Sequence, residues 1–491
     1  MSNSLHLYNT LTRKVEKFTP LNSEKVKIYT CGPTVYSTPH IGNFAAYIYW
    51  DLLVRTLKIN GYAPYRVLNL TDVGHLTSDG DEGEDKLEKG ARQSGKTVWE
   101  VAEYYSNLFL QDYKSLNLIP PDVIAKATDY IEQDEALVDK LIAKGYTYET
   151  SDGIYFDTSK LSTYADFARL DLEKLQAGAR VEFSQEKRNV SDFAVWKFIQ
   201  PGEKHAMRWD YLGRPGYPGW HLECSTIIHT ELGEPIDIHT GGIDHIPVHH
   251  TNEIAQTLTA FDEQLSRYWL HCNHLTSNGE KISKSLGNGY TIQGLIEKGY
   301  SPLDFKMWVL QGHYQSERNF TLQDLEAARK RRLNWRNEIA RSYQLTDFNS
   351  SVKNPLTDLN DGAETLAQVR DALNDNLNSP QAFALIDQAH NIALDFWQQI
   401  DSLFGLKLFE VQENEFDFYI EKTVQIPYGV EDKIFQDLES VNKTVKPILN
   451  ARLIARKKHD YAESDRIRND LYYSGITILD TPQGQIWQYL K

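Results

Sequence analysis

Near the start of the chain, two short apolar runs flank a stretch with helical periodicity. The runs are residues 26–29 and 66–70, and each has the length and composition of a buried strand. Between them, apolar side chains recur every three or four residues. They are Tyr47, Trp50, Val54 and Leu57. Gly61 follows where such a helix would end. A strand, a helix and a second strand in this order favour a parallel sheet.

A second strand-to-helix unit occurs farther along the chain. Residues 236–239 resemble a strand, Gly241 and Gly242 are expected to break it, and the segment after His249 has helical spacing. If both units share one sheet, about 150 residues separate its halves, and an inserted module is the simplest explanation. Residues 322–404 are largely helical in pattern, which predicts a helix bundle. Residues 410–428 mix acidic, aromatic and turn-forming residues, as a linker does.

The composition describes a water-soluble protein with a strong negative charge. The chain has 491 residues, of which 52 are basic and 68 acidic, so its formal charge is -16. It contains no apolar run long enough to span a membrane, and its first residues do not form a signal peptide. We therefore expect no membrane partner and a cytoplasmic location. The negative charge excludes a protein that coats nucleic acid through diffuse attraction, so any RNA contact must be local.

Two basic clusters are candidates for such a contact. The first consists of Arg329, Lys330, Arg331, Arg332 and Arg336. The second consists of Arg452, Arg456, Lys457, Lys458, Arg466 and Arg468. Charge runs are more often solvated helix faces, and that alternative is the favoured one for both clusters.

Two segments have residues suited to bind a nucleotide triphosphate. His40, Gly42 and Asn43 lie between the first strand and the helix, where helix-terminal N–H groups and a histidine can meet phosphate. Residues 281–285, Lys-Ile-Ser-Lys-Ser, lie between glycines, and mobile ammonium groups there can stabilise the charge of a phosphoryl-transfer transition state. Each segment alone is also compatible with an ordinary turn.

Together the two segments resemble the paired ATP-binding motifs of class I aminoacyl-tRNA synthetases. Asn43 stands where many members have a second histidine, and Ile282 stands where methionine is commoner. The chain is most similar to the cysteine-specific branch of that family. The segments that carry this similarity are residues 30–36, 192–197, 219–225, 241–244, 249–253 and 480–484. After Thr71 the chain departs from the family pattern with an acidic insertion, residues 74–84, which we interpret as a solvated surface loop.

The resemblance implies a zinc site. Two cysteines, one histidine and one carboxylate can form a tetrahedral set, and His249 and Glu253 are spaced to share one helix face. The expected ligands are Cys31, Cys224, His249 and Glu253. Without the family, buried structural thiols would be the better interpretation, because the chain has no compact Cys-x-x-Cys pair. Zinc, one ion per chain, would discriminate the substrate thiolate from a hydroxyl and make a separate editing domain unnecessary.

The resemblance also implies partners and residue roles. The partners are cysteine, ATP with Mg²⁺, and tRNA(Cys), and the chain is expected to act as a monomer. Catalytic roles fall to His40, Asn43, Lys281 and Lys284. ATP-binding roles fall to His40, Gly42, Asn43, Gly242, Asp244 and Lys284, and substrate-binding roles to Cys31, Thr71 and Trp220. Core packing is the alternative for Trp220. A noncatalytic RNA-binding relative is the alternative function, against which the intact motifs count.

The predicted fold class is α/β. We expect a Rossmann-like parallel-sheet catalytic domain with an inserted module, followed by a helix bundle and a small C-terminal mixed α/β domain. The expected boundaries are 1–125 and 216–270 for the two halves of the catalytic domain, 126–215 for the inserted connective module, 271–320 for the stem-contact region, 321–409 for the tRNA-binding helix bundle, 410–430 for the linker and 431–491 for the anticodon-binding domain.

Overall fold

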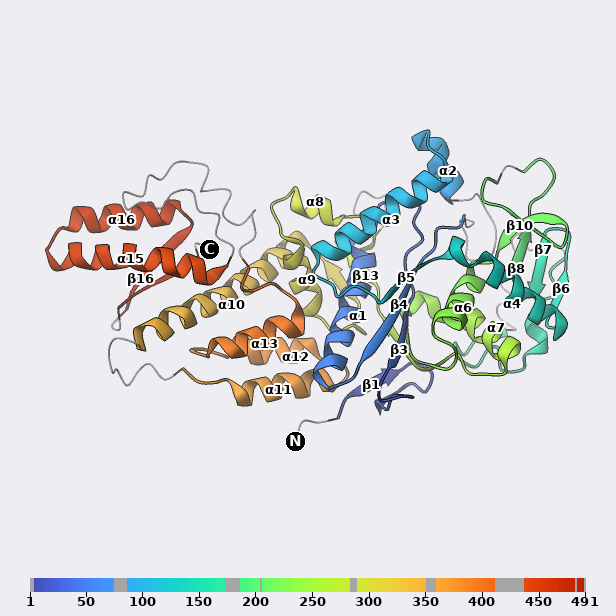
Figure 1. Ribbon diagram of the computed structural model, residues 1–491, viewed down its shortest axis with the longest axis horizontal. Coiled ribbons are helices and arrows are strands. Elements are labelled where there is room, and N and C mark those ends of the chain that lie inside the picture. The colour runs from blue at the N-terminus through green and yellow to red at the C-terminus, as the bar shows by residue number, and fades with distance from the viewer. Residues whose placement is uncertain are drawn as a thin grey trace.

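A five-stranded parallel sheet forms the centre of the protein (Figure 1). The computed structural model describes residues 4–74, 86–172, 186–203, 205–282, 289–349, 359–410, 437–481 and 484–489. In spatial order the strands are β12 (Ser266–Cys272), β11 (Ile236–Gly242), β3 (Val26–Thr30), β4 (Pro64–Leu70) and β5 (Val123–Lys126). The chain runs outward from β3 to one side and from β11 to the other. The carboxyl ends of these two strands therefore flank the switch point where such sheets bind ligands.

The predicted first helix is confirmed as α1 (Ile41–Ile59), which joins β3 to β4. His40 is its N-cap residue, so the helix begins at the carboxyl edge of the sheet. Its buried side includes the four predicted apolar residues. Asn60 is the C-cap, and Gly61 follows with a φ of 81°, a left-handed conformation that favours glycine.

The prediction that Gly241 and Gly242 break their strand is wrong. Both residues belong to β11 and pair in register with His271 and Cys272 of β12. Glycine is needed at position 241 for a different reason. A Cβ atom there would lie 2.6 Å from Cε1 of His250 and 2.8 Å from Nδ1 of His245. The glycine allows close approach of two imidazole rings to the strand.

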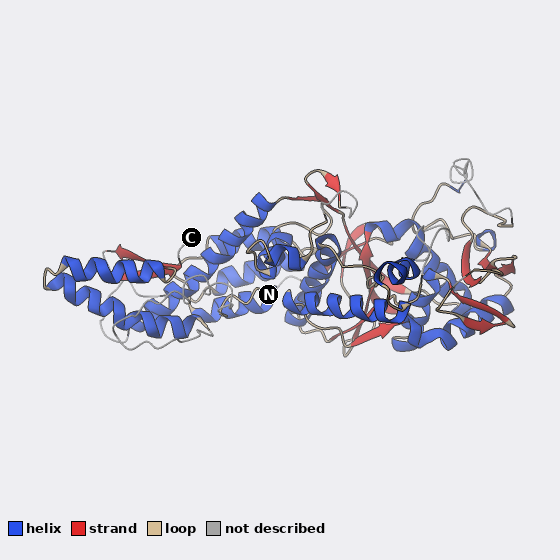
Figure 2. Ribbon diagram, turned by 90° about the horizontal axis from the view of Figure 1, so that it is seen from above, coloured by secondary structure: helices blue, strands red, loops and turns tan. Residues whose placement is uncertain are grey.

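The chain between β5 and α6 (Trp220–Glu231) folds largely into a second, antiparallel sheet. In spatial order its strands are β6 (Thr147–Glu149), β7 (Gly153–Phe156), β8 (Phe193–Phe198), β10 (Arg214–Pro218) and β9 (Trp209–Tyr211). This sheet lies at one end of the elongated molecule (Figures 1 and 2), and the helix α4 (Ile131–Ala143) lies beside it (Figure 1). The return to the parallel sheet comes through α6 and β11.

Residues 322–404 are mainly helical in the part that the structure describes, as predicted. The bundle consists of α10 (Leu322–Asn349), α11 (Ala363–Asn374), α12 (Ser379–Asp387) and α13 (Leu394–Phe404). The last unit consists of α15 (Leu438–Lys457), α16 (Tyr461–Tyr473), β16 (Ile476–Thr481) and β17 (Gly484–Tyr489), and it lies at the opposite end from the antiparallel sheet (Figure 1). Most of the expected linker, from residue 411 on, lies outside the described residues. None of the described helices has the length and apolar character needed to cross a membrane.

Buried charges connect α1 to the helical half of the chain. Asp51 of α1 accepts a hydrogen bond of 2.8 Å from Nζ of Lys306, which belongs to α9 (Pro302–Leu310). Arg55, one turn further along α1, donates to the carbonyl oxygen of Ser402 in α13 at 2.7 Å. The helix that begins at His40 is therefore fixed against the bundle at its other end.

Much of the basic side-chain charge in the two sequence clusters is already paired. Arg332 is buried and donates to Asp304 of α9 at 2.8 Å, while Arg336 is buried and donates to the carbonyl oxygen of Glu410 at 2.8 Å. In the second cluster, Arg452 is buried against Asp480. Arg466 pairs with acidic side chains of its own helix. Neither cluster is a continuous open basic face, but the interpretation as solvated helix faces is wrong for Arg332, Arg336 and Arg452, which are buried.

Candidate active site

Four buried side chains meet near the carboxyl ends of β3 and β11. The ligand atoms of Cys31, Cys224, His249 and Glu253 all lie within 4.8 Å of one another. Cys31 directly follows β3, and Cys224 lies in α6. His249 and Glu253 lie on consecutive helical segments after β11. The four residues expected from the sequence are thus brought together by the parallel sheet and the two helices that pack against it.

A change of helix type places the two ligands that follow β11. Residues Ile246–His250 form a π-helical turn, η4, and α7 (Thr251–Phe261) continues directly from it. His249 belongs to the π-helical turn and Glu253 to the first turn of α7. Short π-helical segments occur frequently at functional sites. Here the segment brings Nε2 of His249 to 2.9 Å from Oε1 of Glu253.

The charges in this cluster favour a bound cation. A hydrogen bond from the Cys31 thiol lowers the pKa of Cys224 to about 6, against the effect of burial. Burial, and then Cys224, raise the pKa of Cys31 well above its ordinary value. Burial alone would lower the pKa of His249, but the Glu253 carboxylate and Cys224 raise it to about 10. The buried thiolate and carboxylate require a positive partner, which a metal ion supplies when the imidazole and the second thiol lose their protons.

The donor set fits zinc. Two sulfur atoms, one imidazole nitrogen and one carboxylate oxygen are ligands that zinc takes in tetrahedral sites, with bonds of about 2.0–2.3 Å. Such bonds place neighbouring donors roughly 3.3–3.8 Å apart. Sγ of Cys224 lies 3.5 Å from Nε2 of His249. The 2.9 Å between His249 and Glu253 is somewhat shorter, so these two donors would separate slightly around an ion.

A second set of donors overlaps the first. Cys31, His239, His250 and Glu253 also have ligand atoms within 4.8 Å of one another. In both sets a histidine already contacts Glu253: Nε2 of His239 lies 2.7 Å from its Oε2, and Nε2 of His249 lies 2.9 Å from its Oε1. The first set has two sulfur donors, which zinc and other soft metals prefer. The first set therefore fits zinc better, and in that arrangement His239 would support Glu253 through its hydrogen bond.

More histidines extend from this cluster into the protein. Nδ1 of His221 lies 2.8 Å from Nδ1 of His249. Nε2 of His250 lies 3.4 Å from Sγ of Cys31, and its Nδ1 lies 2.7 Å from Nε2 of His271. The other ring nitrogen of His271 is hydrogen-bonded to the hydroxyl of Thr10 at 2.8 Å. Partners on the far nitrogen of a ligating imidazole fix its orientation and tautomer. The sequence prediction did not assign these histidines, although His239 and His271 lie in strands that end at the site and His250 adjoins a proposed ligand.

The two expected ATP-binding segments meet at the start of α1. The His40 N–H donates to Oδ1 of Asn43 at 3.1 Å, so Asn43 caps the helix that begins there. A Cβ atom on Gly42 would lie 3.0 Å from two ring atoms of His40 and 3.3 Å from Cδ1 of Ile282. Ile282 belongs to the second segment, and the N–H of Ile41 donates to the carbonyl oxygen of Tyr290 just beyond it at 2.8 Å. Lys281 belongs to β14 (Glu280–Lys281), while Lys284 lies outside the described residues.

The structure describes the expected substrate-binding residues Trp220 and Thr71 and the expected ATP-binding residue Asp244. The ring of Trp220 lies 4.7 Å from that of His249, centroid to centroid, and is only partly buried. Thr71 follows β4 and is buried, and its N–H donates to the carbonyl oxygen of Pro33 at 3.1 Å. Asp244 is exposed in η3 (Ile243–His245), directly after β11. All three therefore lie after strands of the parallel sheet or beside the metal-ligand candidates.

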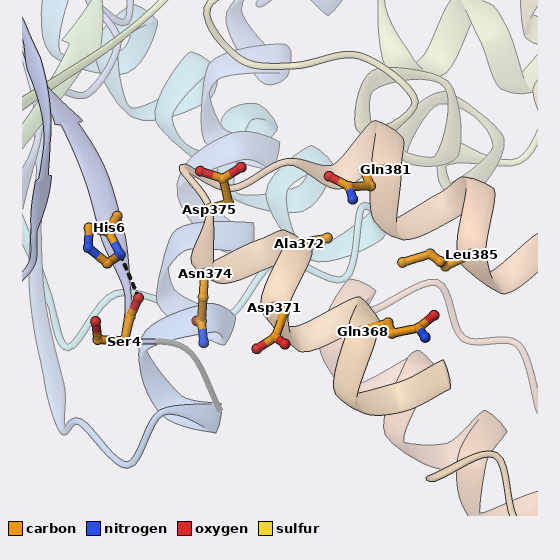
Figure 3. A pocket seen from close by; sticks show the side chains of 9 residues that line it. All are labelled: Ser4, His6, Gln368, Asp371, Ala372, Asn374, Asp375, Gln381 and Leu385. Carbon is orange, nitrogen blue, oxygen red and sulfur yellow. Dashed lines mark hydrogen bonds between the residues drawn. The ribbon is translucent and has the colours of Figure 1, made fainter. Parts of the chain in front are cut away.

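A separate hollow lies between β1 (His6–Asn9) and the helices α11 and α12 (Figure 3). It measures about 570 Å³, and its polar walls include Gln368, Asp371 and Asp375. It contains none of the proposed ligands or ATP-binding residues. The two carboxylates make it unsuitable for the phosphates of a nucleotide.

Comparison with known proteins decides the family. Residues 17–330 match the family of class I (C) tRNA synthetase catalytic domains. Cysteine–tRNA ligase 1 of Burkholderia lata is 40% identical over 484 residues, which cover 98% of this chain and 96% of that protein. Cysteine–tRNA ligase of Treponema denticola is 37% identical, over 99% of this chain and 100% of that protein. The chain belongs to the cysteine–tRNA ligase family.

Membership of this family confirms the resemblance and the enzyme class: the protein is an aminoacyl-tRNA synthetase. Solved structures add independent support for the fold alone. Mycobacterium tuberculosis methionyl-tRNA synthetase, in complex with methionyl-adenylate, is 16% identical with a TM-score of 0.56, over 78% of this chain and 88% of that one. A second structure of that enzyme bound by methionyl-adenylate is 15% identical with a TM-score of 0.57, over 79% of this chain and 88% of that one. The parallel-sheet core is therefore that of a class I synthetase.

Proposed function

We propose that the protein activates cysteine with ATP and transfers it from cysteinyl-adenylate to the 3′-terminal ribose of tRNA(Cys). One observation carries the proposal. In a chain of the cysteine–tRNA ligase family, four donors suited to zinc converge at the ligand-binding edge of the sheet, beside the start of α1. One zinc ion, held by Cys31, Cys224, His249 and Glu253, would supply a soft Lewis acid that accepts a thiolate in preference to a hydroxyl.

In this proposal the chain's own residues position the substrates. Trp220 packs on the ring of His249, so it would close one side of the small amino-acid pocket and exclude water. Thr71, after β4, would face the substrate amino group. With cysteine held at its sulfur and amino ends, its carboxylate would be oriented toward the nucleotide site, where it would attack the α-phosphorus of ATP in line and release pyrophosphate.

The ATP-binding residues would stabilise the charge that develops during phosphoryl transfer. His40 and the N-terminal N–H groups of α1 would bind the phosphates, and Asn43 holds that turn by accepting a hydrogen bond from the His40 N–H. Gly42 leaves room for the imidazole of His40, and Gly242 and Asp244 would contact the ribose. Lys284, assisted by Lys281, would bring ammonium groups to the phosphates, and Mg²⁺ would accompany ATP.

The tRNA would bind along the helical half of the chain. We propose that residues 321–409 form the tRNA-binding bundle and that residues 431–491 form the anticodon-binding unit. Residues 271–320, which connect the catalytic domain to the bundle, would contact the tRNA stem. The catalytic domain comprises 1–125 and 216–270, with 126–215 inserted and 410–430 as the linker. The four proposed zinc ligands come from one chain, so the site needs no partner subunit, and we propose a monomer. We propose the cytoplasm as its location.

Exchange of labelled pyrophosphate into ATP tests the proposal. We expect exchange that depends on cysteine and is absent with serine, followed by charging of tRNA(Cys) with cysteine. Because exchange reports adenylate formation alone, it separates an active ligase from a noncatalytic RNA-binding relative. Absence of cysteine-dependent exchange in zinc-loaded protein would refute the proposal.

A further inference from the structure

A short segment between β7 and β8 of the antiparallel sheet, residues 161–170, packs against the elements that carry Glu253 and its partner His239. The 161–170 segment consists of consecutive turns, and two of its side chains are buried, those of Tyr164 and Phe167. The guanidinium group of Arg13, in the turn after β1, donates to the carbonyl oxygen of Phe167 at 2.8 Å. The segment is therefore tied to the parallel-sheet half of the protein by main-chain and side-chain contacts.

Tyr164 holds the helical turn that carries Glu253. Its Oη donates to Oδ1 of Asn252 at 2.6 Å, whereas the next acceptor, the carbonyl oxygen of Ser191, lies farther away at 3.4 Å. Asn252 is buried near the start of α7 and directly precedes Glu253. A buried hydrogen bond of this kind is costly to leave unmade. It therefore fixes the turn from which the Glu253 carboxylate reaches the other proposed ligands.

Phe167 acts on the same carboxylate from the other side, through two further rings. It packs on Trp269 of β12, with 4.9 Å between the ring centroids. Trp269 in turn stacks on His239, with 4.4 Å between the centroids and 14° between the ring planes. Nε2 of His239 lies 2.7 Å from Oε2 of Glu253. Because packed aromatic rings restrict each other's orientation, Phe167 and Trp269 hold the imidazole in the plane that meets the carboxylate.

We propose that the 161–170 segment positions the Glu253 ligand, so that the chain around the antiparallel sheet controls how firmly the protein holds zinc. The inference rests on the metal site of the proposed function. A ligating carboxylate depends on the partners that fix its orientation. Tyr164 fixes the helical turn of Glu253, and Phe167 fixes the histidine that holds its second oxygen. Two side chains three positions apart in one segment thus act on a single ligand.

Tyr164→Phe and Tyr211→Phe form a matched pair that tests the proposal. Both tyrosines lie between β5 and α6 and are 6% exposed, and each hydroxyl donates a 2.6 Å hydrogen bond to a side-chain oxygen. The acceptor of Tyr211 is Asp139 of α4, a helix that carries no proposed ligand. Both variants should fold with modestly lowered unfolding temperatures. Only Tyr164→Phe should speed zinc release to an excess of the chelator 4-(2-pyridylazo)resorcinol, by about tenfold, the lower end of the range for partners of metal ligands.

Phe167→Leu gives a second measurement, because leucine keeps the position apolar but removes the ring that packs on Trp269. This variant should also release zinc faster, whereas Tyr211→Phe should match the unsubstituted protein. Equal release rates from the two tyrosine variants, or release from Phe167→Leu at the rate of the unsubstituted protein, would overturn the inference. If the unsubstituted protein binds no zinc at all, the metal site of the proposed function fails instead, so the two failures are distinguishable.

Discussion

Nε2 of His249 and Oε1 of Glu253 lie 2.9 Å apart, one helical turn from each other at the junction of η4 and α7. The second oxygen of the same carboxylate contacts Nε2 of His239 at 2.7 Å. Glu253 is therefore fixed from two sides, with one oxygen directed at the proposed ligand cluster. A carboxylate oriented in this way is a preorganised metal ligand.

Cys224→Ser and Cys272→Ser form a matched pair that tests the assignment of the thiols. All three cysteines are buried, but Cys272 belongs to neither donor set and lies in β12. A serine hydroxyl is a much poorer zinc ligand than a thiolate, so Cys224→Ser should lose most bound zinc together with cysteine activation. Cys272→Ser should keep both. Zinc content by mass spectrometry and pyrophosphate exchange are the measurements, and full zinc content in Cys224→Ser would rule out its role as a ligand.

Gly42→Ala tests whether the position of His40 matters for ATP. The added methyl group would lie 3.0 Å from Nδ1 and Cε1 of the imidazole, closer than a Cβ normally packs. We expect kcat/KM for ATP in the exchange reaction to fall about tenfold or more, since a small displacement of a catalytic group is costly. Thermal stability should not fall, because alanine favours a helix over glycine.

The control for this change is Gly90→Ala. Gly90 lies in another helix, α2 (Lys86–Ser94), and its added methyl group would make an ordinary contact of 3.4 Å with Val101. Exchange activity should be unaffected. Equal kcat/KM for ATP in the two variants would show that the imidazole of His40 need not occupy its observed position.

Asp112→Asn is expected to stabilise the protein in a pH-dependent manner. Asp112 is buried in α3 (Val98–Ser115), and burial raises the pKa of its carboxyl group to about 6. The folded state therefore holds this proton more tightly than the unfolded state. The contribution of this proton to the free energy of unfolding is fully present below the pKa that Asp112 has in the unfolded state. It is lost as pH rises through the folded-state pKa, and the total loss is up to about 3 kcal/mol.

Thermal unfolding of both proteins between pH 4 and pH 8 measures this effect. The asparagine variant lacks the ionisation, so its advantage should be small at pH 4, grow up to about pH 6 and then level off. An advantage that does not change with pH would mean that the carboxyl group titrates alike in the folded and unfolded states.

Asp304→Ala should destabilise the junction between α9 and α10. Asp304 accepts a 2.8 Å bond from Nε of the buried Arg332, and it also caps α9 through a 2.9 Å bond from the N–H of Ser301. Removing one partner leaves a buried guanidinium uncompensated, which costs roughly 3–5 kcal/mol. Asp470→Ala, which breaks a solvent-exposed pair with Arg466, should cost less than about 1 kcal/mol. Similar unfolding midpoints for the two variants would contradict this comparison.

Local periodicity and residue chemistry carried the sequence predictions that the structure confirms. The apolar residues from Tyr47 to Leu57 predicted α1 because residues three or four apart lie on the same face of a helix, and that face is buried here. The alternation of strands and helices similarly predicted the parallel sheet. The convergence of Cys31 and Cys224 was different in kind. Their separation in sequence carries no geometric information, and the expectation depended on resemblance to a family.

Features that depend on distant partners could not be predicted locally. Gly241 looks like a strand breaker in sequence, but its role is to admit the rings of His245 and His250. Arg332 looks like part of a solvated basic run, but its burial is decided by Asp304 on another helix. His239 has no motif to mark it, and its importance comes from its contact with Glu253. In each case tertiary packing determines the role of the residue.

X-ray absorption at the zinc edge, with and without cysteine, tests the central claim most directly. In the zinc-loaded protein we expect two sulfur ligands at about 2.3 Å, together with nitrogen and oxygen ligands at shorter distances. Addition of cysteine should raise the sulfur number from two to three, whereas serine should not change it. A sulfur number that stays at two when cysteine is bound would contradict selection of the substrate through its thiolate.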